Sequence, residues 1–463
     1  MRITTPALWV LFVTTLLMIG SQLMQVSQIM KRMVPPEYQL WDHPILNSQG
    51  GSSNETMSAC LLVYDDNHFL TEWLAFHYQT LPLRRLIIAT DPRSRTSPSP
   101  ILQRWKSHGM NITEWTDDDY FPLSYRRAIL RSSLYPNSTN RWVLMHRFRQ
   151  RFLYRDCMKQ LQQEHQPHST TFQTTKNWVV FMDVDEFLFP NRNYKYHFLL
   201  PPPSTTQTVA DILHRLSNAP NLRGPCIGLP RLLIGTKTTP SEDDSSSSSS
   251  SFGNQQAPPT LPEPLQNDLD NAQNRILSNN SSSSSSSLLT FRWIWHEQLL
   301  HHAHNKAGKA MIDLSRISPL AIEWAQIDVH RPLMNVCTIE HHMWAANIDS
   351  PLVLHHYVGT LEQFTFRNDA RQGKRTVEAY QGYQHVNFST LPAWDRKLWL
   401  VGLVQSLGIE TVHSLLHDAG RLETNLTHAT AEESYQRVLQ MLFPTFVPED
   451  RPLKGNASTA NAG

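Results

Sequence analysis

The sequence predicts an α/β protein with a mainly parallel central β-sheet flanked by helices, behind one membrane-spanning helix at the N-terminus. Three observations lead to this prediction. Short, fully apolar segments alternate with longer segments whose apolar residues recur at helical spacing. An uncharged and mostly apolar segment stands near the N-terminus. A cluster of carboxylates directly follows one of the strongest apolar segments.

Charge and composition exclude several classes of protein. The 463 residues include 41 lysines and arginines against 40 aspartates and glutamates, which gives a formal net charge of +1. This balance offers no electrostatic reason to expect a nucleic acid as partner, and we predict none. Apolar residues make up 40% of the chain, which is enough to build a core, so wholesale disorder is excluded.

The first part of the chain predicts a membrane anchor. Residues 7–24 would form a helix roughly 27 Å long, close to the thickness of the hydrocarbon layer. A cleavable signal peptide is the alternative, although its apolar region is normally shorter. With an uncleaved anchor, residues 1–6 are a cytoplasmic tail and residues 25–57 a stem. The layout is then that of a single-pass type II membrane protein.

Glycosylation sequons favour the lumen of the secretory pathway for the rest of the chain. Sequons of the type Asn-X-Ser/Thr without proline at X begin at Asn54, Asn111, Asn137, Asn279, Asn280, Asn387, Asn425 and Asn456. The serine tracts account for two of them, and the others are spread along the chain. We therefore predict a protein of the Golgi or endoplasmic reticulum membrane with its catalytic part in the lumen.

Four cysteines, Cys60, Cys157, Cys226 and Cys337, are too few for a disulfide scaffold. They allow three disulfide pairings, and the sequence does not choose among them. Cys60 lies within an apolar segment and is also compatible with a small buried residue that forms no disulfide.

Strands and helices alternate from the first apolar segment onward. Residues 59–64 (ACLLVY) form a continuous apolar run, which suits a strand buried on both faces. Residues 69–80 place Leu70, Trp73 and His77 at helical spacing, which predicts a helix. Residues 86–89 (LIIA) are a second short buried strand.

The same order continues up to the first serine tract. Residues 101–108 predict a helix, 112–115 a strand, 141–164 a long helix with one basic face, 178–182 (WVVFM) a buried strand, and 209–216 a helix. Repeated strand-helix-strand order favours a mainly parallel sheet. In such sheets ligands bind at the carboxyl ends of the strands.

Low-complexity segments divide the rest of the chain. Residues 238–289 contain two serine runs around a proline-rich stretch, which cannot bury enough apolar area to offset the entropy of ordering. We predict a disordered insertion there and a disordered tail at residues 450–463.

The chemistry of the sequence is concentrated after residues 178–182. Asp183, Asp185 and Glu186 are three carboxylates within four residues, and they repel one another unless a cation is near. Hard oxygens at positions i and i+2 suit Mn²⁺ or Mg²⁺, which leave ligand positions open for substrate phosphates. A solvated acidic turn is the alternative. The aromatic residues on either side favour the metal site.

This motif, WVVFMDVDEFLFP, resembles the D-x-D-E-F element of glycosyltransferase family 92 and related family-2-like enzymes. The resemblance extends back to ACLLVYDDNHFLTEWLAFHYQTLPLRRLIIATD and forward through NKAGKAMIDLSRI, VHRP and LHHYVGTLEQFTFR. It implies a Rossmann-like GT-A fold, with a nucleotide-sugar-binding half at residues 58–237 and an acceptor-side half at 290–449. The family's Lys-Asn-Glu after the first strand is replaced here by Asp65-Asp66-Asn67.

The resemblance also implies roles for individual residues. Asp185 would be the main ligand of the metal, Asp183 would contact the metal or the ribose, and Glu186 would support them or face the sugar. The candidate histidine ligand of the metal is His356, with His355 as its rival, and either is also compatible with an ordinary hydrogen-bonded histidine.

Further polar residues are assigned to the substrates. Arg367, Arg371 and Lys374 would meet the diphosphate, although a solvated basic helix face is equally compatible. Asp65 and Asp91, at the ends of two predicted strands, would hold a uridine. Glu297 and Asp328 are candidates for the catalytic base, and structural pairing is the alternative role for both.

The sequence thus predicts a metal-dependent glycosyltransferase that moves a sugar from a nucleotide-sugar, for which UDP-galactose is known in the family, to a hydroxyl of a glycan or polysaccharide. The transfer would invert the anomeric centre. Two alternatives remain. A haloacid-dehalogenase-type phosphatase also has a D-x-D after a strand, but expects Thr or Val where Phe187 stands. An inactive lumenal glycan-binding protein with the same fold is the other.

Overall fold

A computed structural model gives the fold of one compact unit within residues 54–463. It describes residues 56–131, 138–165, 176–192, 208–215, 225–235, 288–293, 295–296, 308–324, 327–330, 350–367, 375–381, 389–390 and 393–423, with isolated residues between them. The predicted cytoplasmic tail, anchor and C-terminal tail lie outside these ranges, as does the stem apart from its last two residues. Most of the predicted insertion at residues 238–289 also lies outside them, but its last two residues, Leu288 and Leu289, are described and buried. Within these ranges no helix is both long and apolar enough to cross a membrane.

The central sheet has six strands in the order β3-β2-β1-β4-β9-β6. The strands are β1 (Thr56–Val63), β2 (Arg85–Thr90), β3 (Asn111–Trp115), β4 (Asn177–Phe181), β6 (Cys226–Leu229) and β9 (Lys309–Asp313). The first four strands pair in parallel, and β9 runs antiparallel to both β4 and β6. The prediction of a mainly parallel α/β sheet is therefore confirmed, and the arrangement is compatible with a Rossmann-like fold.

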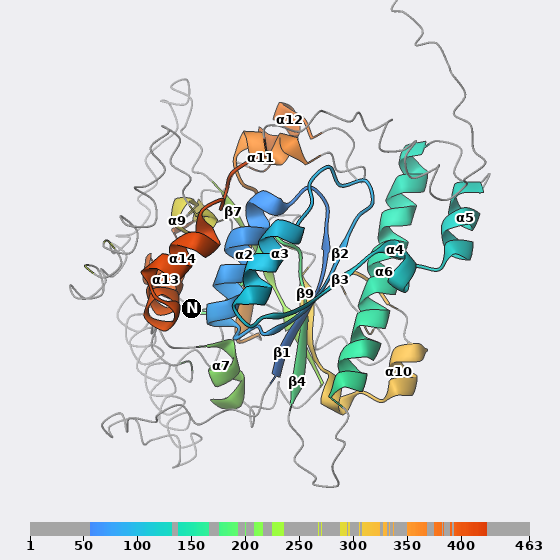
Figure 1. Ribbon diagram of the computed structural model, residues 1–463, viewed down its shortest axis with the longest axis horizontal. Helices are drawn as coiled ribbons and strands as arrows, with labels where there is room; N and C mark the ends of the chain where they lie inside the picture. The colour runs from blue at the N-terminus through green and yellow to red at the C-terminus, as the bar shows by residue number, and fades with distance from the viewer. Residues whose placement is uncertain are drawn as a thin grey trace, which may run out of the picture. The chain divides into compact units, whose positions relative to one another are not determined.

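Helices cover both faces of this sheet (Figure 1). Helices α2 (Asn67–Thr80) and α3 (Ser99–Ser107) lie on one face, and α6 (Ser138–Glu164) lies on the other. Ala59 and Leu61 belong to the core under α2, whereas Cys60 and Leu62 belong to the core under α6. Because both faces of β1 are buried, its sequence is a continuous apolar run and does not alternate with polar residues.

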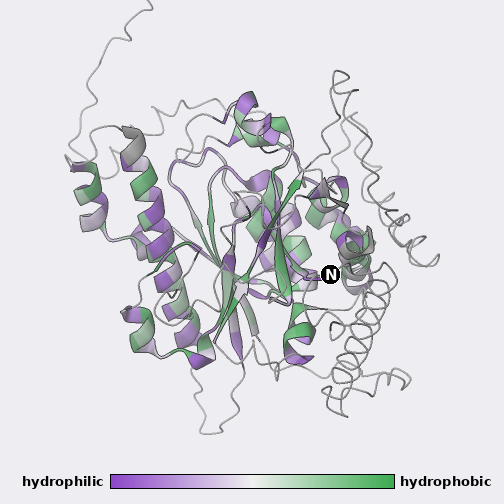
Figure 2. Ribbon diagram, turned by 180° about the vertical axis from the view of Figure 1, so that it is seen from behind, coloured by the Kyte–Doolittle hydropathy of each residue, from purple (hydrophilic) through white to green (hydrophobic). Residues whose placement is uncertain are grey.

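The helices differ in how deeply they are buried. Helix α2 is buried at every position from Asn67 to His77, whereas α3 buries one face through Ile101, Leu102 and Trp105. Figure 2 shows apolar residues along the strands, while the helices carry hydrophilic and hydrophobic residues in turn. The C-terminal helices α13 (Ala393–Leu407) and α14 (Ile409–Leu416) pack against α2 and extend the core on that side.

A second sheet, which the sequence did not predict, has five strands in the order β11-β8-β7-β10-β5. The strands are β5 (Glu186–Pro190), β7 (Arg231–Gly235), β8 (Trp295–His296), β10 (Leu352–Tyr357) and β11 (Ser389–Thr390). The chain passes from β4 to β5 through residues 182–185, so the acidic motif lies where the two sheets join. Residues 58–237 and 290–449 both contribute strands to the central sheet, because β9 lies between β4 and β6.

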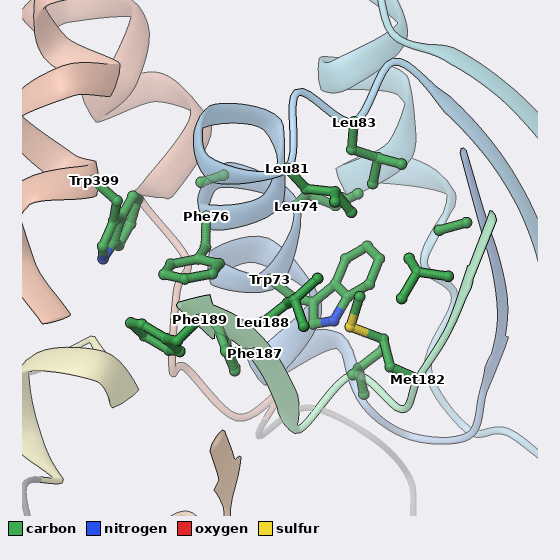
Figure 3. Packing of buried hydrophobic residues seen from close by; sticks show 14 of the residues in the cluster. Trp73, Leu74, Phe76, Leu81, Leu83, Met182, Phe187, Leu188, Phe189 and Trp399 are labelled. Atoms are coloured by element: carbon green, nitrogen blue, oxygen red, sulfur yellow. The ribbon is translucent and has the colours of Figure 1, made fainter. Parts of the chain in front are cut away.

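Helix α2 anchors the first residues of β5. Trp73 Nε1 donates a hydrogen bond to the carbonyl oxygen of Glu186 (3.0 Å). His77 Nδ1 donates to the carbonyl oxygen of Trp73 (2.8 Å), and His77 Nε2 accepts from the Leu188 amide (3.2 Å). Burial lowers the pKa of His77 to about 3, so the ring is neutral, as these two bonds require. Figure 3 shows Trp73 and Phe76 facing the residues of β5.

Another side chain of α2 joins it to the chain beyond the serine tracts. The carboxylate of Glu72 is fully buried and accepts hydrogen bonds from the amides of Leu289 (2.5 Å) and Thr290 (3.0 Å). These amides open helix α9 (Leu289–Arg292), whose first N–H groups lack partners within the helix. The carboxylate therefore caps a helix that is distant in sequence.

Two disulfides tie the central sheet to its surroundings. Cys60 of β1 is bonded to Cys157 of α6, and Cys226 of β6 is bonded to Cys337. The structure thus selects one of the three pairings, and Cys60 is more than a small buried residue.

Candidate functional site

A cavity of about 340 Å³ opens at the carboxyl ends of β1 and β4. The residues that matter most in its lining are Tyr64, Asp66, Asp183, Asp185, His356 and Arg367. The chain leaves β1 toward β2 and β3 on one side, and returns to β4 on the other side of β1. This is the topological switch point at which open α/β sheets bind ligands.

The acidic turn between β4 and β5 is held by its own backbone and by β10. The Glu186 amide donates to the carbonyl oxygen of Asp183 (3.0 Å), and the Tyr357 amide donates to that of Asp185 (2.8 Å). This geometry sends the three carboxylates in two directions, because Asp183 and Glu186 turn toward one set of cations and Asp185 toward another.

Asp183 and Glu186 contact a buried lysine and an arginine. Lys309 Nζ lies 3.0 Å from Asp183 Oδ2 and 3.8 Å from Glu186 Oε2. Arg231 Nη1 lies 3.2 Å from Glu186 Oε1. Burial alone would lower the pKa of Lys309, but the two carboxylates outweigh it and hold that pKa above its usual value. Lys309 is therefore a permanent cation beneath the acidic turn.

Asp185 faces Arg367 and His356. Arg367 Nη1 lies 2.9 Å from Asp185 Oδ2, and Arg367 Nε lies 2.5 Å from Asp66 Oδ1. His356 Nε2 lies 3.5 Å from the same Asp185 oxygen. Burial would raise the pKa of Asp185, but Arg367 and His356 outweigh it and hold that pKa well below its usual value. Asp185 is thus a carboxylate at any physiological pH.

A glycine allows the chain to bring Arg367 here. Gly359 follows β10 with φ +81°, and a Cβ at this position would lie 2.8 Å from Phe69 Cζ. Helix α11 (Leu361–Phe366) begins directly afterwards with a capping box formed by Thr360 and Gln363. Arg367 directly follows the last residue of α11, so the turn and the cap together set its position.

The two candidate histidines on β10 point to opposite sides, as neighbours on a strand do. His356 lines the cavity beside Asp185. His355 is buried in the second sheet, where its ring stacks on Phe189 with centroids 4.1 Å apart. Burial lowers the pKa of His355 well below its usual value, so this ring is neutral. Of the two, only His356 is near the acidic turn.

These contacts change the argument for a metal ion. Three adjacent carboxylates need nearby positive charge, which the sequence alone suggested would come from a metal ion. In the structure, Lys309, Arg231 and Arg367 supply positive charge to these carboxylates. In the part of the chain that is described, no three His, Cys, Asp or Glu side chains are grouped as a metal site. Asp185 and His356 still fit Mn²⁺ or Mg²⁺ as two protein ligands, with phosphates and water completing the shell. Asp183 Oδ2 instead accepts a hydrogen bond from Lys309 Nζ, and a contact of Asp183 with a metal or a ribose stays a prediction.

Asp65 and Asp91 have structural partners. Asp65 Oδ1 accepts from the Arg95 amide (2.5 Å), and Asp65 Oδ2 accepts from Arg95 Nε (2.8 Å). Asp91 Oδ2 contacts Arg93 and Arg149, each at 2.9 Å. Neither aspartate lines the cavity, and a contact of either with uridine stays a prediction.

Of the two predicted candidates for the catalytic base, Asp328 and Glu297, the structure describes only Asp328. Asp328 Oδ1 accepts the amide of His330 (3.0 Å), Asp328 Oδ2 lies 3.8 Å from Arg151 Nη2, and Asp328 is absent from the cavity lining. Glu297 lies outside the described residues. The same is true of Arg371 and Lys374, the predicted partners of the diphosphate.

Sequence reasoning missed several residues of this site. Asp66 is one: it lines the cavity beyond the end of β1 at Val63, and Asp65 between them has a φ of +56°, so strand alternation does not extend to it. Nothing in the sequence around Lys309 or Arg231 indicates that they contact the acidic turn, because they reach it from β9 and β7, which are distant in sequence.

Comparison of this chain with models of protein families, with curated proteins and with solved structures found no match.

Proposed function

We propose that this protein is a metal-dependent glycosyltransferase of the GT-A type, which transfers a sugar from a nucleotide-sugar to a hydroxyl of a glycan or polysaccharide with inversion. The observation that carries the proposal is the grouping of Asp185, His356 and Arg367 in a cavity at the carboxyl ends of β1 and β4. This combination of an acidic turn, a histidine and an arginine suits a nucleoside diphosphate better than a neutral ligand.

The residues of the cavity divide the work of such a reaction. Asp185 and His356 would hold Mn²⁺ or Mg²⁺, which neutralises charge on a departing diphosphate. Arg367 and Arg375 also line the cavity and would bind the phosphate oxygens directly. Lys309 would keep the acidic turn in place through Asp183 and Glu186. Departure of the diphosphate would thus be stabilised by fixed positive groups.

A lumenal location agrees with this function. Two disulfides persist in oxidising compartments such as the secretory pathway. Asn111, the first residue of β3 and part of a predicted sequon, is exposed and accessible to a glycan. Both features support the proposal of a Golgi or endoplasmic reticulum enzyme that is anchored by residues 7–24.

The proposal is tested by a thermal-shift panel of nucleotide-sugars with and without Mn²⁺. A ligand that binds the folded state raises its stability, by about 2.7 kcal/mol at a hundredfold excess over Kd. We expect a UDP-sugar to raise the melting temperature only together with Mn²⁺, and Asp185→Asn to abolish this rise. Asp118→Asn, an exposed carboxylate outside the cavity, is the control. No response to any nucleotide-sugar would refute the proposal.

A further inference from the structure

An inverting transfer requires a group that accepts the proton of the acceptor hydroxyl. Asp328, one of the two carboxylates suggested by the sequence, is bonded to the His330 amide and does not line the cavity. His330 itself does line the cavity, close to Asp183 and Arg231. No role has been assigned to this side chain so far.

The hydrogen bonds of His330 fix its tautomer. His330 Nδ1 lies 3.0 Å from the carbonyl oxygen of Gly308. A carbonyl oxygen only accepts hydrogen bonds, so Nδ1 carries the proton and Nε2 keeps its lone pair. Nε2 has no hydrogen-bond partner among the residues that the structure describes. The ring thus offers an unused proton acceptor in a cavity lined by charged groups.

The backbone of His330 is held at the same time. Asp328 Oδ1 accepts the His330 amide at 3.0 Å, which closes a short turn. Gly308 directly precedes Lys309, the first residue of β9, and β9 pairs with β4. The imidazole is therefore tied to the start of β9, and β9 pairs with β4, the strand that leads into the acidic turn. Asp328 acts on His330 and would itself be a positioning residue.

We propose that His330 Nε2 is the general base of the transfer, an inference that rests on the proposed function. The acceptor hydroxyl gives its proton to Nε2 while its oxygen forms a bond to the anomeric carbon. The bond from that carbon to the diphosphate oxygen breaks, and its electron pair leaves with the nucleoside diphosphate. The imidazolium then releases the proton to water, which returns the neutral ring.

The charge state of His330 agrees with this role. Burial, Lys309 and Arg231 lower the pKa of His330 to about 4, and Asp183 opposes them in part. The ring is therefore neutral at any pH of the secretory pathway. A base of this strength is sufficient, because ordinary carboxylates with a pKa of about 4 deprotonate the nucleophile in inverting glycosidases.

The other two histidines of the cavity each place one ring nitrogen near a carboxylate. His356 Nε2 faces Asp185 at 3.5 Å, and His146 Nδ1 lies 3.5 Å from Asp91 Oδ2. Among the described residues, no carboxylate lies within hydrogen-bond distance of His330 Nε2.

The test compares His330→Ala, His330→Gln and the control His108→Ala in UDP release from UDP-galactose with Mn²⁺ and a released N-glycan as acceptor. His108 Nδ1 also contacts a backbone carbonyl, that of Arg104 (2.8 Å), but lies outside the cavity. We expect both His330 variants to lose kcat by about 10²- to 10⁴-fold while KM for the donor and its thermal shift stay unchanged. Added imidazole should restore part of the activity of His330→Ala and none of that of His330→Gln, whose side chain fills the site.

Several results would overturn the proposal. They are full kcat in His330→Ala, loss of donor binding in step with kcat, and failure of imidazole to restore any turnover. Failure of the proposed function is distinguishable, because the wild-type protein would then show neither a donor-dependent thermal shift nor UDP release.

Discussion

Replacing Arg367 with glutamine should strengthen Mn²⁺ binding to the protein in the absence of nucleotide. Arg367 contacts Asp185 and Asp66, and its guanidinium therefore competes with a metal ion for the same Asp185 oxygen. Glutamine has a shorter, uncharged side chain, which removes the competing charge and leaves polar groups at the site. The effect should be visible directly as metal affinity, without any need for catalytic turnover.

The size of the effect follows from the contact distance. Two unit charges 4 Å apart attract by about 4 kcal/mol at the effective dielectric constant of about 20 found near protein surfaces. Arg367 Nη1 is closer than this to Asp185 Oδ2, at 2.9 Å, but it keeps part of its attraction through Asp66 when a metal enters. We therefore expect at least a tenfold gain in affinity, which corresponds to about 1.4 kcal/mol.

Electron paramagnetic resonance of free Mn²⁺ during titration measures this affinity. UDP should tighten Mn²⁺ binding to the wild-type protein more than to Arg367→Gln, because the diphosphate offers the arginine another anion. Arg104→Gln is a matched control, since Arg104 pairs with Asp418 at 2.8 Å outside the cavity. Equal or weaker Mn²⁺ binding by a folded Arg367→Gln protein would show that this arginine does not compete for Asp185.

Three further predictions concern stability. Burial raises the pKa of Glu72 from 4.5 to about 7, so this carboxyl is easier to protonate in the folded state than in the unfolded state. Its contribution to stability is therefore present at low pH and is lost as pH rises from about 4.5 through 7. Urea unfolding at several pH values should show a loss of up to about 3 kcal/mol in the wild-type protein and no such loss in Glu72→Gln. Trp73→Phe removes the donor to the Glu186 carbonyl and should lower the free energy of unfolding by about 1–3 kcal/mol in the same assay. Replacing Cys60 and Cys157 together by serine opens a loop with a sequence separation of 97 and should cost about 3–5 kcal/mol, measured against the wild-type protein without reductant. An unchanged unfolding midpoint in either last case would contradict the contact on which it depends.

The parallel strands of the central sheet and the helices between them follow from local sequence. The structure has strands at Thr56–Val63, Arg85–Thr90 and Asn177–Phe181, close to the predicted 59–64, 86–89 and 178–182. Runs that are apolar on both faces and helices with one apolar face leave few alternatives, because each must bury that surface. The acidic turn at a strand end follows in the same way, since Asp183 and Asp185 come directly after a buried strand.

The pairing of charged groups at the site and the second sheet depend on contacts between residues that are far apart in sequence. The tertiary structure turned Asp183 to Lys309 and Asp185 to Arg367 and His356, across separations of more than a hundred residues. It also made residues 186–190 a strand of a second sheet, which periodicity did not reveal because the strand is short and follows β4 almost at once. A carboxylate and its partner cation leave no mark on each other's neighbouring sequence, so which charges meet depends on how the strands pair.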